Sequence, residues 1–200
     1  MSTAVEQEKI KEIITRDEFK HNLNYGLRFL NATNKTVTSL TFLYVIGTRM
    51  LVSAYFGAGA IVTMAIVKVL KRIFREARPV GMTYKVTYGF PSTHSATITY
   101  YATFITLSCF YLPIHPAISF LPRVIINPLI PLAAISGAAV VCVSRIRLGH
   151  HTLKQVGAGA IVGLIVGWLW FDGWAGRGWG KDIGWQLTEY LPYFIQDLIR

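Results

Sequence analysis

The chain has 200 residues, of which 52% are hydrophobic and 15% charged, and its formal net charge is +10. This length fits one domain, and the composition is too apolar for an ordinary soluble domain of this size. The positive charge would suit a nucleic-acid-binding protein, but no basic helix or nucleic-acid-binding motif accompanies it. We therefore expect a membrane protein with an anionic partner and no nucleic acid partner.

Residues 1–36 are polar and predict an amphipathic N-terminal arm, with four apolar residues between Ile10 and Phe19 on the face that meets the membrane surface. The following run, Val37–Ile46, is apolar but too short to be counted as a span. If it does cross the membrane, the N-terminus changes side. Two Asn-x-Thr acceptors at Asn31 and Asn34 are positioned to report that side if they are glycosylated.

Four longer apolar runs predict transmembrane helices, because each is about long enough to cross roughly 30 Å of hydrocarbon. These runs are Met50–Leu70, Ser95–Ile114, Val124–Val143 and Gln155–Phe171. Residues 37–171 are therefore interpreted as a membrane-embedded domain of an all-α, multi-span helical bundle. In the last run Gly159, Gly163 and Gly167 recur every fourth residue, a pattern that favours close helix packing.

The C-terminal residues 172–200 predict an interfacial aromatic tail. All five tryptophans of the chain fall between Trp168 and Trp185. Tryptophan is enriched where a membrane meets water, because its ring is apolar and its N–H is polar.

Three short polar islands separate the apolar runs. They are Lys71-x6-Arg78-Pro79, Pro91-Ser92-Thr93-His94 and Ser144-Arg145-x5-His151. Helices that alternate in direction bring all three islands to the same face of the membrane. No Asp or Glu lies between Glu76 and Asp172, so we expect no metal site and no cofactor there. Cations and histidines without carboxylates predict a site for a phosphorylated lipid.

The cations and the start of one helix are suited to a phosphoryl group, which spreads negative charge over three oxygens during transfer. Lys71 and Arg78 are two helical turns apart and are expected on one face of a helix end. Arg145 adds a second guanidinium. Ser92 and Thr93 precede a helix, and the N–H groups at a helix start bind anions.

Two histidines, His94 and His151, complete the set, since imidazole can act as nucleophile, general acid or general base. Each island alone has a structural explanation. Basic residues anchor headgroups, Pro-Ser-Thr-His caps a helix, and His150 or His151 could be an interfacial histidine with its hydrogen bonds satisfied. The joint occurrence of the islands on one face favours the functional interpretation.

The islands resemble the three signatures of the type 2 phosphatidic acid phosphatase (PAP2) superfamily, which are Lys-x6-Arg-Pro, Pro-Ser-Gly-His and Ser-Arg-x5-His-x3-Asp. The resemblance covers residues 71–155 and implies hydrolysis of a lipid phosphate through a phosphohistidine. It implies that His151 is the nucleophile and His94 the general acid. The phosphate-binding residues that it implies are Lys71, Arg78, Ser92, Thr93 and Arg145.

Two positions depart from these signatures. Thr93 replaces a glycine, and Gln155 replaces the aspartate that would orient the nucleophile. The Gln155 carbonyl can accept a hydrogen bond from the His151 Nδ1–H, but it cannot stabilise an imidazolium by charge. A carboxylate introduced at position 155 is therefore expected to leave substantial activity or to raise it.

The segment Leu148–Gln155 is similar to the third motif of the dolichyldiphosphatase branch, which carries glutamine at this position. The resemblance implies an enzyme of lipid metabolism for protein glycosylation in the endoplasmic reticulum. Such an enzyme removes the terminal phosphate of dolichyl diphosphate on the lumenal side. Two alternatives stay open: a phosphatase of phosphatidic acid, sphingosine phosphate or another isoprenyl diphosphate, and a catalytically silent lipid-binding membrane protein. The presence of both His94 and His151 argues against the second.

Overall fold

The computed structural model describes residues 33–48, 51–79, 87–112, 122–176 and 178. Within these ranges the chain forms five α-helices and a π-helical turn, with no strand. The helices are α3 (Thr33–Thr48), α4 (Leu51–Phe74), α5 (Thr93–Tyr111), α6 (Arg123–Arg147) and α7 (Leu153–Phe171), and the π-helical turn is Asp172–Gly176. The prediction of an all-α protein is confirmed. The arm predicted for residues 1–36 lies outside the described residues except for the start of α3.

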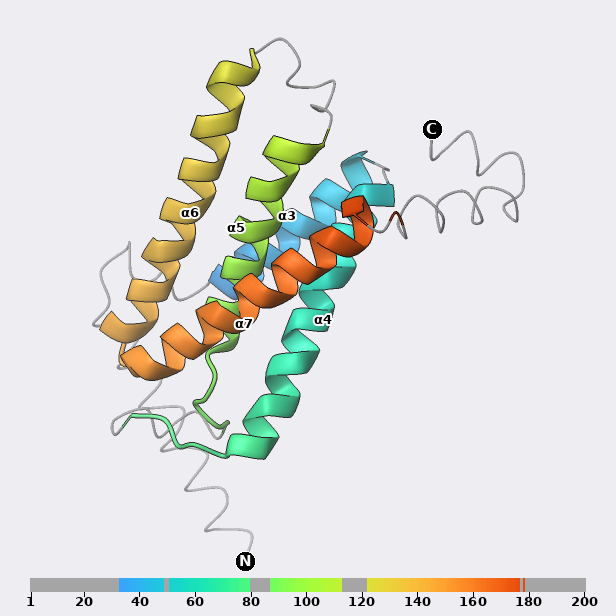
Figure 1. Ribbon diagram of the computed structural model, residues 1–200. Coiled ribbons are helices and arrows are strands. Elements are labelled where there is room, and N and C mark those ends of the chain that lie inside the picture. Colours follow the sequence, from blue (N-terminus) through green and yellow to red (C-terminus); the bar gives the residue numbers. More distant parts are fainter. Residues whose placement is uncertain (1–32, 49–50, 80–86, 113–121, 177, 179–200) are drawn as a thin grey trace, which may run out of the picture.

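Three segments of the described chain are long and apolar enough to cross a membrane: Leu51–Phe74, Arg123–Arg147 and Leu153–Gly176. The fourth expected span, α5, is not among them. This helix packs against α4, α6 and α7 and lies between α6 and α7 in Figure 1. Because its neighbours shield it from lipid, α5 can carry Ser, Thr and Tyr residues that an isolated span could not.

The closest helix pair is α5 and α7, and the glycines of α7 make it possible. A Cβ atom at Gly163 would collide with the Ala96 carbonyl oxygen, and one at Gly167 would lie 2.8 Å from the Thr103 Cβ. Both contacts are on α5. The close packing predicted from the glycine spacing is therefore confirmed.

Aromatic side chains fill the bundle at the end opposite to the polar islands. Tyr100 and Phe104 of α5 are buried with Phe171 of α7, and the Phe104 and Phe171 rings meet edge to face at 5.5 Å. Trp170 stacks on Tyr55 of α4 at 4.8 Å, and its Nε1 donates to the Tyr55 carbonyl at 2.9 Å. Trp170 therefore joins α4 to α7, a packing role that the predicted interfacial belt did not include. The rest of the predicted tail lies outside the described residues, apart from the π-helical turn and residue 178.

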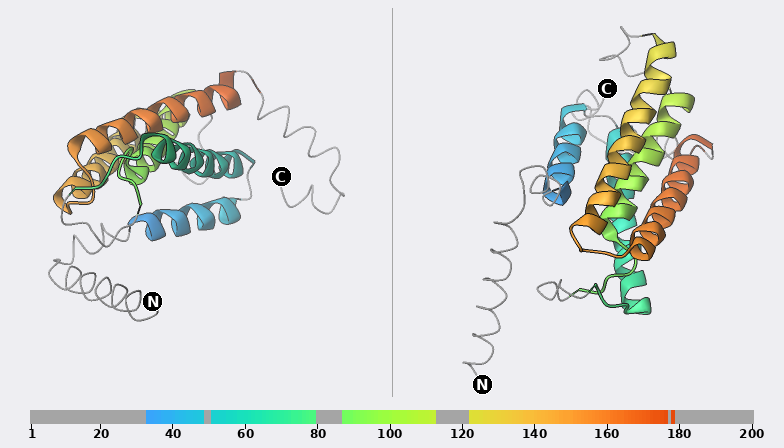
Figure 2. Two further views of the ribbon diagram at one scale, coloured as in Figure 1. Left: turned by 90° about the horizontal axis from the view of Figure 1, so that it is seen from below. Right: turned by 90° about the vertical axis from the view of Figure 1, so that its left-hand side faces the viewer.

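The run Val37–Ile46 is part of α3, which lies on the opposite side of α4 and α5 from α7 (Figure 2). Its 16 residues rise only about 24 Å, less than the thickness of a bilayer core. Thr41 Oγ1 donates to the Tyr101 hydroxyl at 3.0 Å, so α3 is joined to α5 as well as packed along α4. The helix is therefore part of the bundle, although it is shorter than the three membrane-spanning segments.

Candidate active site

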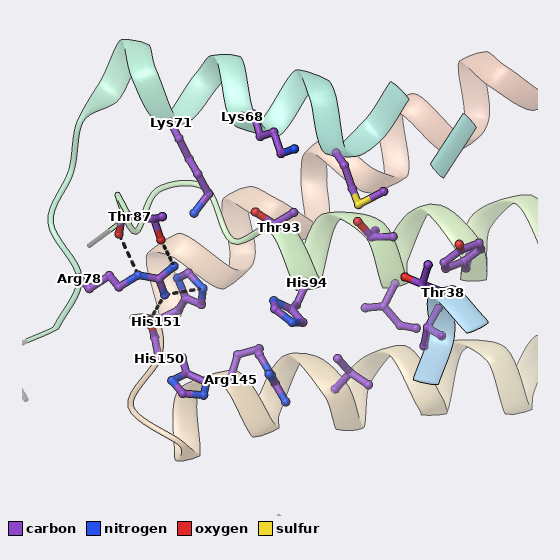
Figure 3. A pocket seen from close by; sticks show the side chains of 16 residues that line it. Thr38, Lys68, Lys71, Arg78, Thr87, Thr93, His94, Arg145, His150 and His151 are labelled. Carbon is purple, nitrogen blue, oxygen red and sulfur yellow. Dashed lines mark hydrogen bonds between the residues drawn. The ribbon is translucent and has the colours of Figure 1, made fainter. Parts of the chain in front are cut away.

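The three polar islands meet at one end of the bundle, as expected from the alternating directions of the helices. The end of α4, the start of α5, the end of α6 and the start of α7 lie together there (Figure 1). They surround a cavity of about 380 Å³. Its charged and imidazole side chains, all labelled in Figure 3, are Lys68, Lys71, Arg78, His94, Arg145, His150 and His151.

Lys71 and Arg78 reach the cavity from different kinds of backbone. Helix α4 ends at Phe74, and Arg75 adopts a left-handed conformation with φ 49°, so the chain turns before Arg78. The prediction that Lys71 and Arg78 share one helix face is therefore wrong. Lys71 lies in the last turn of α4 and its Nζ donates to the Tyr88 carbonyl at 2.6 Å, whereas Arg78 approaches from the segment after the helix.

The Arg78 guanidinium joins the first island to the third. Its Nε donates to the Thr87 carbonyl and its Nη2 to the Thr87 hydroxyl, both at 2.9 Å. Its Nη1 donates to the His150 carbonyl at 3.0 Å and lies 3.2 Å from the His151 Nε2 (Figure 3). These contacts hold a planar cation beside the imidazole that the family resemblance implies is the nucleophile.

The second island forms the start of α5. Ser92 is fully buried and caps the helix, because its Oγ accepts from the Ser95 N–H at 3.4 Å and from the Ser95 hydroxyl at 3.0 Å. Its own N–H donates to the Gln155 carbonyl at 2.9 Å. Ser92 therefore attaches α5 to α7, while Thr93 and His94, the next two residues, line the cavity.

Arg145 lies in the last turn of α6, where a cation is favoured by the helix dipole. Only 1% of its surface is exposed, and its Nε and Nη2 donate to the Ser144 Oγ at 3.2 and 3.1 Å. The chain then turns through Gly149, whose φ of 68° suits glycine. The N–H groups of His150 and His151 both donate to the Arg145 carbonyl, at 3.0 and 3.3 Å. The backbone thus holds both histidines against the cavity.

The His151 imidazole is buried, and each of its two nitrogens faces a polar side chain. Its Nδ1 lies 3.2 Å from the Gln155 Oε1. Arg78 can only donate, so the facing His151 Nε2 must accept and the hydrogen resides on Nδ1. The pKa of His151 is lowered to about 3, chiefly by burial and next by the positive charge of Arg78, while the hydrogen bond with Gln155 opposes this. The ring is therefore neutral at physiological pH, with its lone pair on Nε2.

Gln155 has a second set of partners that the sequence analysis did not anticipate. It forms a capping box with Thr152 at the start of α7, where its Oε1 accepts from the Thr152 N–H at 3.3 Å. Its Nε2 donates to the Glu76 Oε1 at 2.8 Å and to the Ala77 carbonyl at 2.9 Å. Thr152-x-x-Gln155 is a readable capping signature. Glu76 lies inside the first island, at the limit of the acid-free stretch, and no motif in the sequence indicates its contact with Gln155.

In the described part of the chain, no group of three or more His, Cys, Asp or Glu residues could hold a metal ion. The expectation that the site works without a metal stays a prediction, because it concerns activity.

A helical membrane bundle with a cationic cavity that three histidines line, at one end of its helices, has the character of a membrane protein for an anionic ligand. Residues 51–179 match the PAP2 superfamily, and the chain belongs to that superfamily.

Three curated proteins are similar to the chain. It is 37% identical to dolichyldiphosphatase 1 of Dictyostelium discoideum over 107 residues, which are 52% of this chain and 44% of the relative. It is 34% identical over 127 residues to lipid phosphate phosphatase gamma of Arabidopsis thaliana, covering 62% of this chain and 54% of the relative. It is 29% identical over 131 residues to the dolichyldiphosphatase of Saccharomyces cerevisiae, covering 62% and 52%. The chain thus spans about half the length of these relatives. No solved structure matches it.

Proposed function

We propose that the chain is an integral membrane lipid phosphatase that acts through a phosphohistidine on His151. The observation that carries this proposal is the setting of the His151 ring. Its Nδ1 is held by Gln155, and its Nε2 faces Arg78 inside a cationic cavity. A neutral imidazole with a fixed tautomer among cations is suited to attack a phosphorus atom.

The reaction has two steps. In the first, the Nε2 of His151 forms a bond to the terminal phosphorus, the bond to the leaving oxygen breaks, and a protonated His94 gives its proton to that oxygen. In the second, the neutral His94 takes a proton from a water molecule as the water oxygen attacks the phosphorus. The P–N bond then breaks, inorganic phosphate leaves and both histidines regain their starting forms.

The phosphate oxygens are bound by the groups around the cavity. Lys71, Arg78 and Arg145 supply charge, and the backbone N–H groups at the start of α5 supply donors near Thr93. Ser92 supports this set by capping α5 and fixing its first turn against α7. In the resting geometry Arg78 faces the His151 Nε2, so a phosphate must draw the guanidinium toward its own oxygens before attack.

The substrate that the sequence supports best is dolichyl diphosphate, converted to dolichyl phosphate and inorganic phosphate. Two of the similar proteins are named as dolichyldiphosphatases. The segment that ends at Gln155 also resembles the third motif of that branch, which carries glutamine there. Residence in the endoplasmic reticulum, with the cavity facing the lumen, belongs to the same proposal. A lipid phosphate monoester is the second candidate, since another similar protein is named as a lipid phosphate phosphatase.

The test is an assay of the purified chain on dolichyl diphosphate, other isoprenyl diphosphates, phosphatidic acid and sphingosine phosphate, in buffer with EDTA. We expect release of phosphate that persists in EDTA, is inhibited by vanadate and is highest with dolichyl diphosphate. His151→Ala should abolish it. His150→Ala is the matched control and should leave much of it, because Arg78 contacts position 150 through the backbone carbonyl.

Binding of these lipids without turnover would contradict the proposal and favour a silent lipid-binding protein. Activity in His151→Ala would show that another group is the nucleophile. Loss of activity in EDTA with recovery on added Mg²⁺ would exclude the metal-independent mechanism.

A further inference from the structure

Among the residues that the structure describes, no carboxylate contacts the His151 Nδ1 directly, but the carboxylate of Glu76 is connected to it through one intervening residue, Gln155. Gln155 stands between the two groups, with its Oε1 3.2 Å from the His151 Nδ1 and its Nε2 2.8 Å from the Glu76 Oε1. His151, Gln155 and Glu76 thus form a continuous chain of hydrogen bonds from the cavity to the segment that follows α4.

The partners of the Gln155 amide leave it only one orientation. The Glu76 carboxylate and the Ala77 carbonyl are both acceptors, so the amide nitrogen must face them. The amide oxygen must then face the His151 Nδ1 and the Thr152 N–H. This orientation requires a hydrogen on Nδ1 and therefore leaves the lone pair on the Nε2 that faces the cavity.

We propose that Glu76 is a positioning residue for the nucleophile, acting through Gln155. This inference rests on the proposed function, in which His151 is that nucleophile. Together with the Ala77 carbonyl, Glu76 holds the amide orientation that, with Arg78, sets the tautomer of His151. Its negative charge also polarises the amide, which makes the Gln155 oxygen a better acceptor when the ring becomes an imidazolium during attack.

Residues around Glu76 keep it in contact with Gln155. The Gly89 N–H donates to the Glu76 carbonyl at 2.7 Å, and a Cβ atom at Gly89 would lie 2.6 Å from the Gln155 Nε2. Position 89 therefore has room only for glycine while the amide keeps its place. Lys154 pairs with Glu76 at 3.5 Å but is 76% exposed, so it is the natural control for an exposed ion pair.

The first experiment compares Glu76→Gln with Lys154→Gln on the lipid that the wild-type protein hydrolyses best. An amide at position 76 has nearly the size of the glutamate, but it carries no charge and allows the Gln155 amide to turn over. We expect kcat to fall by roughly 10–100-fold, the usual scale for a group that supports a reacting residue. KM should stay nearly constant because Lys71, Arg78 and Arg145 are unchanged. Lys154→Gln should leave both constants near their wild-type values.

The second experiment exchanges the two groups. Gln155→Glu alone places a carboxylate against Glu76 and the Ala77 carbonyl, so it should lose activity by repulsion. This reverses the expectation from sequence that a carboxylate here preserves activity. Adding Glu76→Gln supplies an amide donor to the new carboxylate, and the double variant should be several-fold more active than Gln155→Glu alone.

A kcat for Glu76→Gln within about twofold of wild type, instead of the expected loss of roughly 10–100-fold, would overturn the inference. A double variant no better than Gln155→Glu would overturn it as well. The tautomer of His151 is a readout that does not depend on turnover, measured by ¹⁵N NMR of histidine-labelled protein. Because Arg78 also favours Nδ1–H, the comparison is made in the Arg78→Met background. There we expect Nδ1–H while Glu76 is present and a mixture of tautomers once Glu76→Gln is added. An unchanged tautomer would contradict the role of Glu76, whereas absence of turnover with the expected tautomers would contradict only the proposed function.

Discussion

At the scale of single residues, the candidate site places charged side chains beside a neutral imidazole, that of the proposed nucleophile His151. Arg78 and Lys71 raise the positive potential that an anionic lipid requires. The same charges, together with burial, keep the His151 ring unprotonated. Under the proposed function, Arg78 would serve twice: its positive charge attracts the anionic substrate, and the same charge disfavours protonation of His151.

The first consequence is a pH dependence of His151, which lies in the connection between α6 and α7. Because its pKa is lowered to about 3, the folded state keeps the ring neutral as pH falls through the range in which an exposed histidine would bind a proton. In ¹⁵N NMR of the substrate-free protein, the His151 nitrogens should show no titration between about pH 7 and 5. Arg78→Met removes a charge that lowers this pKa, so protonation of His151 should begin at a higher pH than in the wild type. A midpoint of about 6.5 in the wild-type protein, the value of a free histidine, would contradict this account.

At the scale of helices, α5 and α7 form the rigid part that carries the site. The N–H of Ser92 at the start of α5 donates to the carbonyl of Gln155 in the first turn of α7. Further along both helices, the glycines of α7 keep the pair close. The distance between His94 and His151 therefore depends on how closely this pair packs.

Gly163→Ala tests that packing. The added Cβ would meet the Ala96 carbonyl oxygen, a backbone atom that cannot rotate away, so we expect a cost of about 1–3 kcal/mol. Gly157→Ala on the same helix is the matched control, because nothing lies within 4 Å of its Cβ position. It should be neutral or slightly stabilising, since alanine favours helix more than glycine. Thermal unfolding in detergent measures both, and equal midpoints for the two variants would contradict the role of Gly163.

The helices and the end of the bundle at which the islands meet could be predicted from the sequence. Long apolar runs revealed the helices, and their alternating directions predicted where the islands meet. The turn at Arg75 could not be predicted, because a left-handed helix end is usually marked by glycine and here it is not. The contact between Glu76 and Gln155 joins residues 79 positions apart. Periodicity and local motifs do not report such a contact.

At the scale of the whole molecule, the cavity combines a cationic end with an apolar end. Lys71, Arg78 and His151 lie at one end in Figure 3, and Thr38 of α3 lies at the other. Apolar lining residues come from α3, α4, α5 and α6: they are Val37, Met64, Ile98 and Val141. A headgroup at the cationic end would thus place the first carbons of its tail among four helices.

The size of this cavity limits how much of a lipid it can enclose. Its volume of about 380 Å³ is near the lower end of the roughly 300–1,000 Å³ that pockets for small molecules occupy. A diphosphate and the first carbons of its chain fit that space, while the rest of a long isoprenoid must remain in the bilayer. Groups outside the cavity bind the ground state and the transition state equally, so they affect KM more than kcat.

We therefore expect kcat to be nearly independent of tail length for α-saturated isoprenyl diphosphates, from a short soluble chain to dolichyl diphosphate. KM should fall as the tail lengthens, because a longer tail concentrates the substrate in the micelle or bilayer. Steady-state kinetics in one detergent at fixed micelle concentration measure both constants. Val141→Phe narrows the apolar end and should raise KM for every tail length alike, since it affects the carbons that all these substrates share. A kcat that rises steadily with tail length would mean that the protein binds distal isoprene units in its transition state, outside the cavity described here.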